Sequence, residues 1–124
     1  MRSTLSIAAL ILTLPAAAKA VEPCQRIHGR AVFYPADSQL RIWHIGTHHE
    51  FQPDYNHDDP SWDKVVVLLK GGNEEAGAAG NNALFADFLI CPTEPYHVGA
   101  VQSALIRRMD HTHVVPRDQA GEPR

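Results

Sequence analysis

The chain has few of the features that mark an enzyme, a membrane protein or a nucleic-acid-binding protein. It contains no G-x-S-x-G or H-E-x-x-H motif and no glycine loop of the kind that holds phosphates or dinucleotides. It also has no cluster of basic residues, and its formal net charge of −3 disfavours nucleic acid and anionic lipid as partners. We interpret the chain as a non-catalytic protein.

Long apolar runs are equally scarce, and the clearest one lies at the N-terminus. Arg2, the apolar stretch 5–14 and the small-x-small site Ala18-Lys19-Ala20 form the pattern of a secretory signal peptide over residues 1–20. The apolar stretch is shorter than the roughly 20 residues of a membrane span. We therefore expect a periplasmic or secreted protein with no stable membrane insertion once the signal peptide is cleaved.

The chain has only two cysteines, Cys24 and Cys91. In an oxidising compartment two cysteines most simply form one disulfide bond, although a reactive or metal-binding pair is the alternative. We predict a disulfide bond between Cys24 and Cys91, worth about 4 kcal/mol in the chain-entropy description.

Alternating and β-branched residues predict more strands than helices, without the rhythm of a βαβ fold. The expected fold is a small antiparallel β-sandwich or barrel-like domain with one short inserted helix, covering residues 21–115 and followed by a disordered tail, 116–124. The expected strands are residues 27–34, 40–45, 85–91, 98–106 and 110–115.

One segment has the signals of a short helix. Asp59 is suited to the N-cap, Pro60 to the first helical position and Gly71 to the position after the last turn. The β-branched run at residues 65–67 favours a strand instead. We predict a helix over residues 60–70, preceded by an irregular polar stretch over residues 48–59 and followed by a flexible loop over residues 71–82.

Residues 40–51 contain the strongest strand chemistry in the chain. Trp43 and its neighbouring isoleucines predict a central strand that is covered on both faces, with Trp43 in the core. A turn at Gly46-Thr47 would then place His48 near the surface.

Three short motifs resemble those of a known group of proteins. They are His28-Gly29-Arg30, then Arg41-Ile42-Trp43-x-Ile45-Gly46-Thr47, then Asp87-Phe88-x-Ile90-Cys91-Pro92. The chain resembles small secreted bacterial proteins of unknown function with HGR, RIWxxGT and GDFxVCP motifs, although Ala86 replaces the glycine of the third motif. It is more distantly similar to prealbumin-like, carboxypeptidase-regulatory-type β-sandwiches. Both resemblances imply a β-domain and neither implies a catalytic residue.

Eight histidines are an excess for a chain of this length, and imidazole is a common ligand of transition metals. On a strand, Met109, His111 and His113 would share one face, with the two histidines about 6.6 Å apart. A thioether beside two imidazoles suits copper or zinc. The adjacent pair His48 and His49 is a weaker candidate, because its side chains point to opposite faces of an extended chain.

The acidic stretch from Asp54 to Asp59 imitates the start of a calcium-binding loop. The EF-hand count fails because Asp59 replaces the required glycine and Val65 replaces the final glutamate. We interpret the stretch as an acidic loop before the helix, with a calcium site of another type as the alternative.

Two functions are consistent with these features. The first is an exported, non-catalytic β-domain with a binding, structural or interaction role toward an unknown protein or small ligand. The second is a small periplasmic protein that binds copper or zinc through its histidines. The non-catalytic β-domain would need no cofactor.

Overall fold

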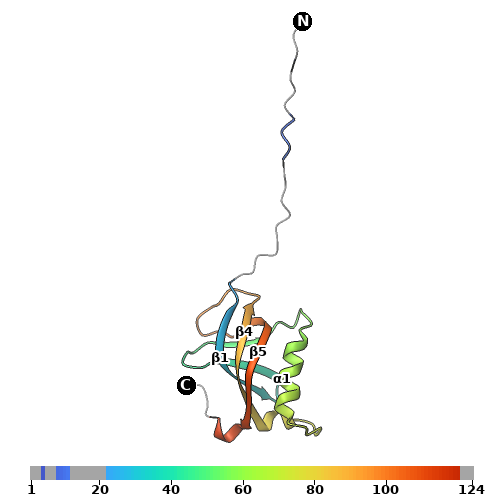
Figure 1. Cartoon of the computed structure of the whole chain (residues 1–124), viewed down its shortest axis with the longest axis vertical. Helices are drawn as coiled ribbons and strands as arrows, with labels where there is room; N and C mark the ends of the chain where they lie inside the picture. Colours follow the sequence, from blue (N-terminus) through green and yellow to red (C-terminus); the bar gives the residue numbers. More distant parts are fainter. Residues whose placement is uncertain (1–3, 5–7, 12–21, 121–124) are drawn as a thin grey trace.

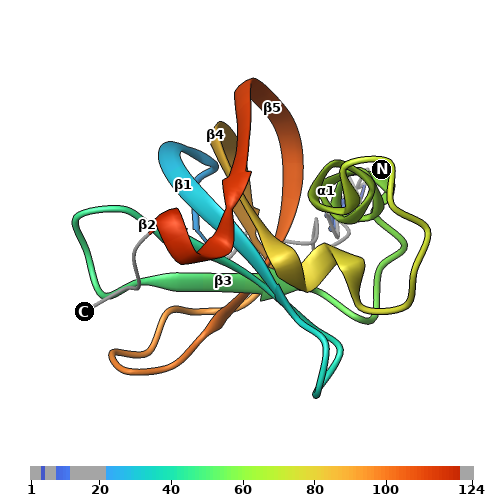
Figure 2. The same ribbon diagram turned by 90° about the horizontal axis from the view of Figure 1, so that it is seen from below.

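In the part of the chain that the structure describes, five strands close into a barrel, with one α-helix packed beside it (Figures 1 and 2). The computed structural model describes residue 4, residues 8–11 and residues 22–120. The elements in chain order are β1 (Gln25–Tyr34), β2 (Gln39–His44), β3 (Glu50–Pro53), α1 (Pro60–Lys70), η1 (Ala78–Asn81), β4 (Asn82–Pro92), β5 (Gln102–Pro116) and η2 (Arg117–Gln119). The predicted small β-domain with one inserted helix is confirmed, in the form of a barrel.

The predicted signal peptide, residues 1–20, lies almost entirely outside the described residues. Within the described part of the chain, no helix is long and apolar enough to span a membrane.

Strands β1 and β2 form the expected hairpin around the turn at residues 35–38. Ile42 on β2 is fully buried, as are Ala31 on β1 and Phe51 on β3. Trp43, by contrast, lies outside the barrel, where its ring contacts the guanidinium of Arg30 at 5.6 Å. The prediction of Trp43 in the core is wrong, because the barrel interior takes only alternate residues of a strand. His48 is exposed, as predicted.

Strand β3 occupies part of the stretch that was expected to be irregular. It pairs with β2 through Ile42↔Phe51 and Trp43↔Glu50, and with β5 in parallel through Phe51↔Gln102 to Pro53↔Ala104. A four-residue strand carries little sequence signal of its own, and its pairing with β5 joins segments about fifty residues apart.

The two strands predicted at residues 98–106 and 110–115 are one long strand, β5, which begins later than expected at Gln102. Register shifts interrupt its pairing with β4 between Phe85 and Asp87 and again between Leu89 and Ile90. At the first of these His111 adopts a positive φ of 54°. The second shift falls at Arg107, within the gap between the two predicted segments.

Helix α1 has the ends that the sequence predicts. Asp59 is the N-cap and accepts a hydrogen bond from the Ser61 N–H at 3.0 Å, and Gly71 adopts the left-handed conformation at the C-terminal end. The helix buries Trp62, Val65 and Leu69 against the core of the barrel. The Trp62 indole also donates to the carbonyl of Ala104 at 3.0 Å, which ties the helix to β5.

Two regions are more ordered than the sequence suggests. The expected flexible loop at residues 71–82 contains η1, whose Ala78 and Ala79 are buried. The expected disordered tail begins with η2, where the Arg117 guanidinium lies 4.6 Å from the ring centre of Tyr34. The last four residues lie outside the described chain.

The predicted disulfide bond between Cys24 and Cys91 is present. It joins the start of β1 to the end of β4, one residue beyond the paired residues Gln25 and Ile90. The bond therefore fastens two strands that are already neighbours in the closed barrel.

The strands are arranged around the barrel in the order β1-β2-β3-β5-β4, and the helix lies between β3 and β4 in the chain. This is the connectivity of a five-stranded OB-type barrel. Barrels of this type carry many functions, so the connectivity defines the architecture and the site must be argued from its side chains.

Candidate functional site

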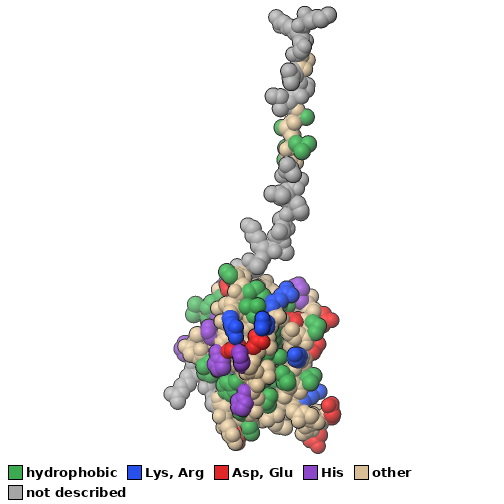
Figure 3. Space-filling model, viewed as in Figure 1, with side chains coloured by type: hydrophobic (Ala, Val, Ile, Leu, Met, Phe, Trp, Pro, Cys, Tyr) green, Lys and Arg blue, Asp and Glu red, His purple; other side chains and the backbone are tan. Residues whose placement is uncertain are grey.

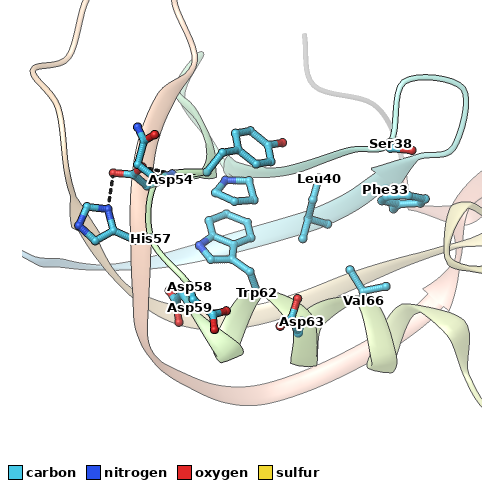
Figure 4. A pocket seen from close by; sticks show the side chains of 13 residues that line it. Phe33, Ser38, Leu40, Asp54, His57, Asp58, Asp59, Trp62, Asp63 and Val66 are labelled. Carbon is cyan, nitrogen blue, oxygen red and sulfur yellow. Dashed lines mark hydrogen bonds and ion pairs between the residues drawn. The ribbon is translucent and has the colours of Figure 1, made fainter.

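A groove of about 490 Å³ lies between helix α1, the loop after β3 and the β1–β2 hairpin. We call it the α1 groove. Phe33, Leu40, Trp62 and Val66 form its apolar floor, as Figure 4 shows. Its remaining lining residues are Ser38, Pro53, Asp54, Tyr55, Asn56, His57, Asp58, Asp59 and Asp63. Its volume lies within the range of small-ligand sites, and four of its eight polar side chains are carboxylates.

The groove lies where the ladder between β2 and β3 ends. Their pairing ends at Ile42↔Phe51, and in the same register Pro53 would stand opposite Leu40. Pro53 has no N–H to donate, and it pairs instead with Ala104 of β5. The chain then leaves the sheet and returns as α1, and both Leu40 and Pro53 line the opening.

Two of the four carboxylates in the groove have structural roles. One oxygen of Asp59 accepts from the Ser61 N–H, and the other accepts from the Ile106 N–H at 2.8 Å. Asp54 accepts from the Asn56 N–H at 2.9 Å and contacts the His57 ring at 3.1 Å (Figure 4). These two residues shape the loop and hold the start of the helix against β5.

The pKa of Asp54 lies below its ordinary value. The largest cause is the Thr93 hydroxyl, which faces the carboxylate without meeting the geometry of a full hydrogen bond. The Asn56 N–H and the His57 ring lower the pKa further, while partial desolvation opposes them. Asp54 is therefore held as a carboxylate at neutral pH.

Asp58 and Asp63 differ from these two residues. Both are exposed, and within the described chain neither makes a hydrogen bond or an ion pair. We call them the rim carboxylates. Tyr55, on the same loop, leaves 68% of its surface exposed beside them. The groove thus combines an apolar floor, an exposed aromatic ring and two carboxylates that form no ion pair with the described residues.

A second polar cluster covers the outer face of β1, β4 and β5. The Asp87 carboxylate contacts the Nδ1 atoms of His28 at 3.1 Å and His111 at 3.0 Å, and the Arg26 guanidinium at 3.4 Å. Figure 3 shows histidine, arginine and acidic side chains side by side on this face. The His28 contact is the largest cause that lowers the pKa of Asp87, followed by His111 and Arg26, while desolvation opposes them.

The structure separates the predicted metal ligands. Met109 packs against the hydrophobic core, His111 turns toward Asp87 through its positive φ, and His113 is exposed. Among the described residues, no group of three or more histidine, cysteine, aspartate or glutamate side chains is placed to hold a metal ion. Copper or zinc binding stays a prediction.

The two histidines of the weaker metal-site candidate, His48 and His49, also lie in different surroundings. His48 is exposed, whereas His49 stacks between Phe51 and Tyr96, with ring centres 4.2 Å and 4.0 Å away. Its Nε2 lies 2.8 Å from the Oε1 of Gln102, which is 1% exposed.

The amide of Gln102 fixes the direction of these bonds. Its Nε2 donates to the Glu94 carbonyl and to the Glu22 carboxylate, so its Oε1 is the acceptor and His49 is the donor. Glu22 also accepts from the Tyr96 N–H, and this bond is the largest cause that lowers the pKa of Glu22. The network fastens loop 93–101 to the barrel.

Of the rim carboxylates, Asp58 was visible in the sequence only as part of a calcium-like loop, and Asp63, in the first turn of α1, was not singled out. Tyr55 and Trp62 carried no signal that would assign them to the same site. Phe33 and Leu40 come from a different hairpin, so sequence spacing could not join them to the acidic loop.

Comparisons of the chain with family models, with curated proteins and with solved structures each give no match. The functional argument therefore depends on the groove itself.

Proposed function

We propose that this protein is an exported, non-catalytic binding domain whose α1 groove holds a cationic ligand with an apolar part. The observation that carries the proposal is the position of Asp58 and Asp63 at the edge of an apolar groove, as exposed carboxylates without an ion pair among the residues that the structure describes. A positive group would be attracted to these charges, and the attached apolar part would cover the floor around Trp62 and Val66.

Export is supported by the signal-peptide pattern of residues 1–20 and by the disulfide bond between Cys24 and Cys91. A binding role is supported by the chain's lack of any catalytic motif. The acidic balance of the chain also favours cationic over anionic ligands.

Calorimetric titration with phenethylamine tests the proposal, with 2-phenylethanol as the uncharged analogue of similar shape. We expect phenethylamine to bind more tightly and its affinity to fall with added salt. Replacing both rim carboxylates, Asp58→Asn with Asp63→Asn, removes two exposed charge interactions of about 0.2–1 kcal/mol each, so affinity should fall roughly 2- to 30-fold.

The matched control is Glu74→Gln with Glu75→Gln, because this exposed acidic pair does not line the groove. The control changes total charge by the same amount and should leave affinity within about twofold, since distant exposed charges are screened. Equal affinity for the amine and the alcohol, no binding of either, or an equal loss in both double variants would each contradict the proposal.

A further inference from the structure

One histidine, His57, lies among the residues that line the α1 groove. Histidine is the side-chain type that ordinarily gains or loses its charge between pH 5 and 8. Aspartate and tyrosine side chains ordinarily titrate near about pH 4 and about pH 10. The other titratable residues of the groove are all of these two types: Asp54, Tyr55, Asp58, Asp59 and Asp63.

Asp54 fixes the position at which His57 takes up a proton. The Nδ1 atom of His57 lies 3.1 Å from a carboxylate oxygen of Asp54, and 60% of the His57 side chain is exposed (Figure 4). A carboxylate only accepts hydrogen bonds, so Nδ1 of the neutral ring carries the hydrogen and donates it to Asp54. A proton from solvent therefore binds at Nε2 and turns the ring into an imidazolium.

The charged groups around His57 are carboxylates. Among the described residues that line the groove, none is a lysine or an arginine, and the β1–β2 hairpin contributes no charged side chain. From the loop between β4 and β5, Thr93 faces Asp54, and the next residue, Glu94, accepts from the Ser103 N–H at 2.8 Å. An imidazolium at His57 would therefore be the first positive charge in a groove lined by four carboxylates.

We infer that His57 makes cation binding by the α1 groove depend on pH, with tight binding to the neutral ring and weaker binding to the imidazolium. This inference rests on the proposed function and adds the regulation of the same site. The sign follows from charge, because an imidazolium repels a positive ligand and offsets part of the attraction of the carboxylates. By linkage, a bound cation disfavours the proton on His57 by the same factor. The groove thus holds its ligand at neutral pH and releases it in acidic surroundings.

Calorimetric titration with phenethylamine at pH 7.5 and pH 5.5, in buffer of low ionic strength, tests the inference. An alkyl amine is protonated and aspartate side chains are ordinarily ionised at both pH values, so His57 is the part of the groove that changes charge. Since interactions between exposed charges are weak, we expect an affinity roughly 1.5- to 5-fold lower at pH 5.5.

Two variants assign this change to His57. His57→Asn keeps a donor for Asp54 and takes up no proton, so its affinity for phenethylamine should be the same at both pH values. His48→Asn is the matched control, because His48 is also exposed and does not line the groove. This control should keep the pH dependence of the unmodified protein, since distant exposed charges are screened.

NMR signals of the histidine rings supply a direct readout. In a pH titration, the His57 ring should take up its proton at lower pH when phenethylamine is bound, whereas the His48 ring should respond equally with and without the ligand.

The outcomes separate this inference from the proposed function. Phenethylamine binding with the same affinity at both pH values overturns the inference and leaves the cation-binding function standing. A pH dependence that persists in His57→Asn, or an unchanged His57 titration in the complex, has the same meaning. Absence of phenethylamine binding at pH 7.5 overturns the proposed function and the inference together.

Discussion

Asp59 connects helix α1 to the barrel, and its replacement provides the sharpest test of the structure. One carboxylate oxygen caps the helix through the Ser61 N–H, and the other accepts from the Ile106 N–H of β5. We predict that Asp59→Ala lowers the free energy of unfolding by about 2–4 kcal/mol, since a lost N-cap costs about 1 kcal/mol and a lost bond to a charged acceptor about 1.5–3 kcal/mol.

Asp59→Asn separates the two contributions. Asparagine caps a helix about as well as aspartate, so the bond from the Ser61 N–H can persist. The side-chain amide then turns its NH₂ group toward the Ile106 N–H, where two donors meet. We therefore expect Asp59→Asn to retain the cap and to lose only the second contribution, with a cost of about 1–3 kcal/mol.

The measurement is urea denaturation at pH 7 with the disulfide bond intact, followed by circular dichroism and tryptophan fluorescence. In a thermal melt of the same variant, the expected loss in Asp59→Ala corresponds, for a domain of about 100 residues, to a melting temperature lower by roughly 10–25 °C. Asp63→Ala is the matched control, because Asp63 lies in the first turn and is exposed. A cost for Asp59→Ala no larger than that for Asp63→Ala would refute the reasoning.

Three other predictions follow from separate regions. Gly29→Ala should destabilise the barrel by about 1–3 kcal/mol in the same denaturation assay, because its new Cβ would lie 2.9 Å from two core side chains; an unchanged midpoint would contradict this. The Asp87 pKa is lowered in the folded state, so its stabilisation is present above the unfolded-state pKa and is lost as pH falls below about 4. Asp87→Asn should reduce this loss of stability at low pH. Asp37→Asn, which replaces an exposed turn residue, should leave the loss unchanged. The same dependence of stability on pH in both variants would contradict the role given to Asp87. If the metal prediction is right, protein loaded with copper or zinc and dialysed should retain stoichiometric metal, and unchanged metal content in His111→Ala with His113→Ala would rule out that site.

Local signals in the sequence were enough to predict helix α1. Asp59, Pro60 and Gly71 define its ends through contacts within one turn, and the structure confirms each position. The disulfide bond was predictable because the chain offers only one possible pair, Cys24 and Cys91.

The sequence could not place Trp43, because apolar residues on both faces of β2 indicate a strand without saying which face turns inward. Barrel closure decided this, since the register Ile42↔Phe51 puts Ile42 inside and Trp43 outside. The sequence could not predict β3 either. Its four residues have little strand preference of their own, and their strand geometry depends on pairing with β2 and β5.

The sequence by itself thus determined the helix, the disulfide bond, the hairpin turn at residues 35–38 and a β-rich fold, since each depends on neighbouring residues or on a unique pairing. The tertiary structure alone decided the α1 groove. Its apolar floor comes from Phe33 and Leu40 on one hairpin and from Trp62 on the helix, which are separated by more than twenty residues. The end of the β2–β3 ladder beside the groove depends on the register that sets Leu40 opposite Pro53, and register is a property of paired strands that a single strand does not possess.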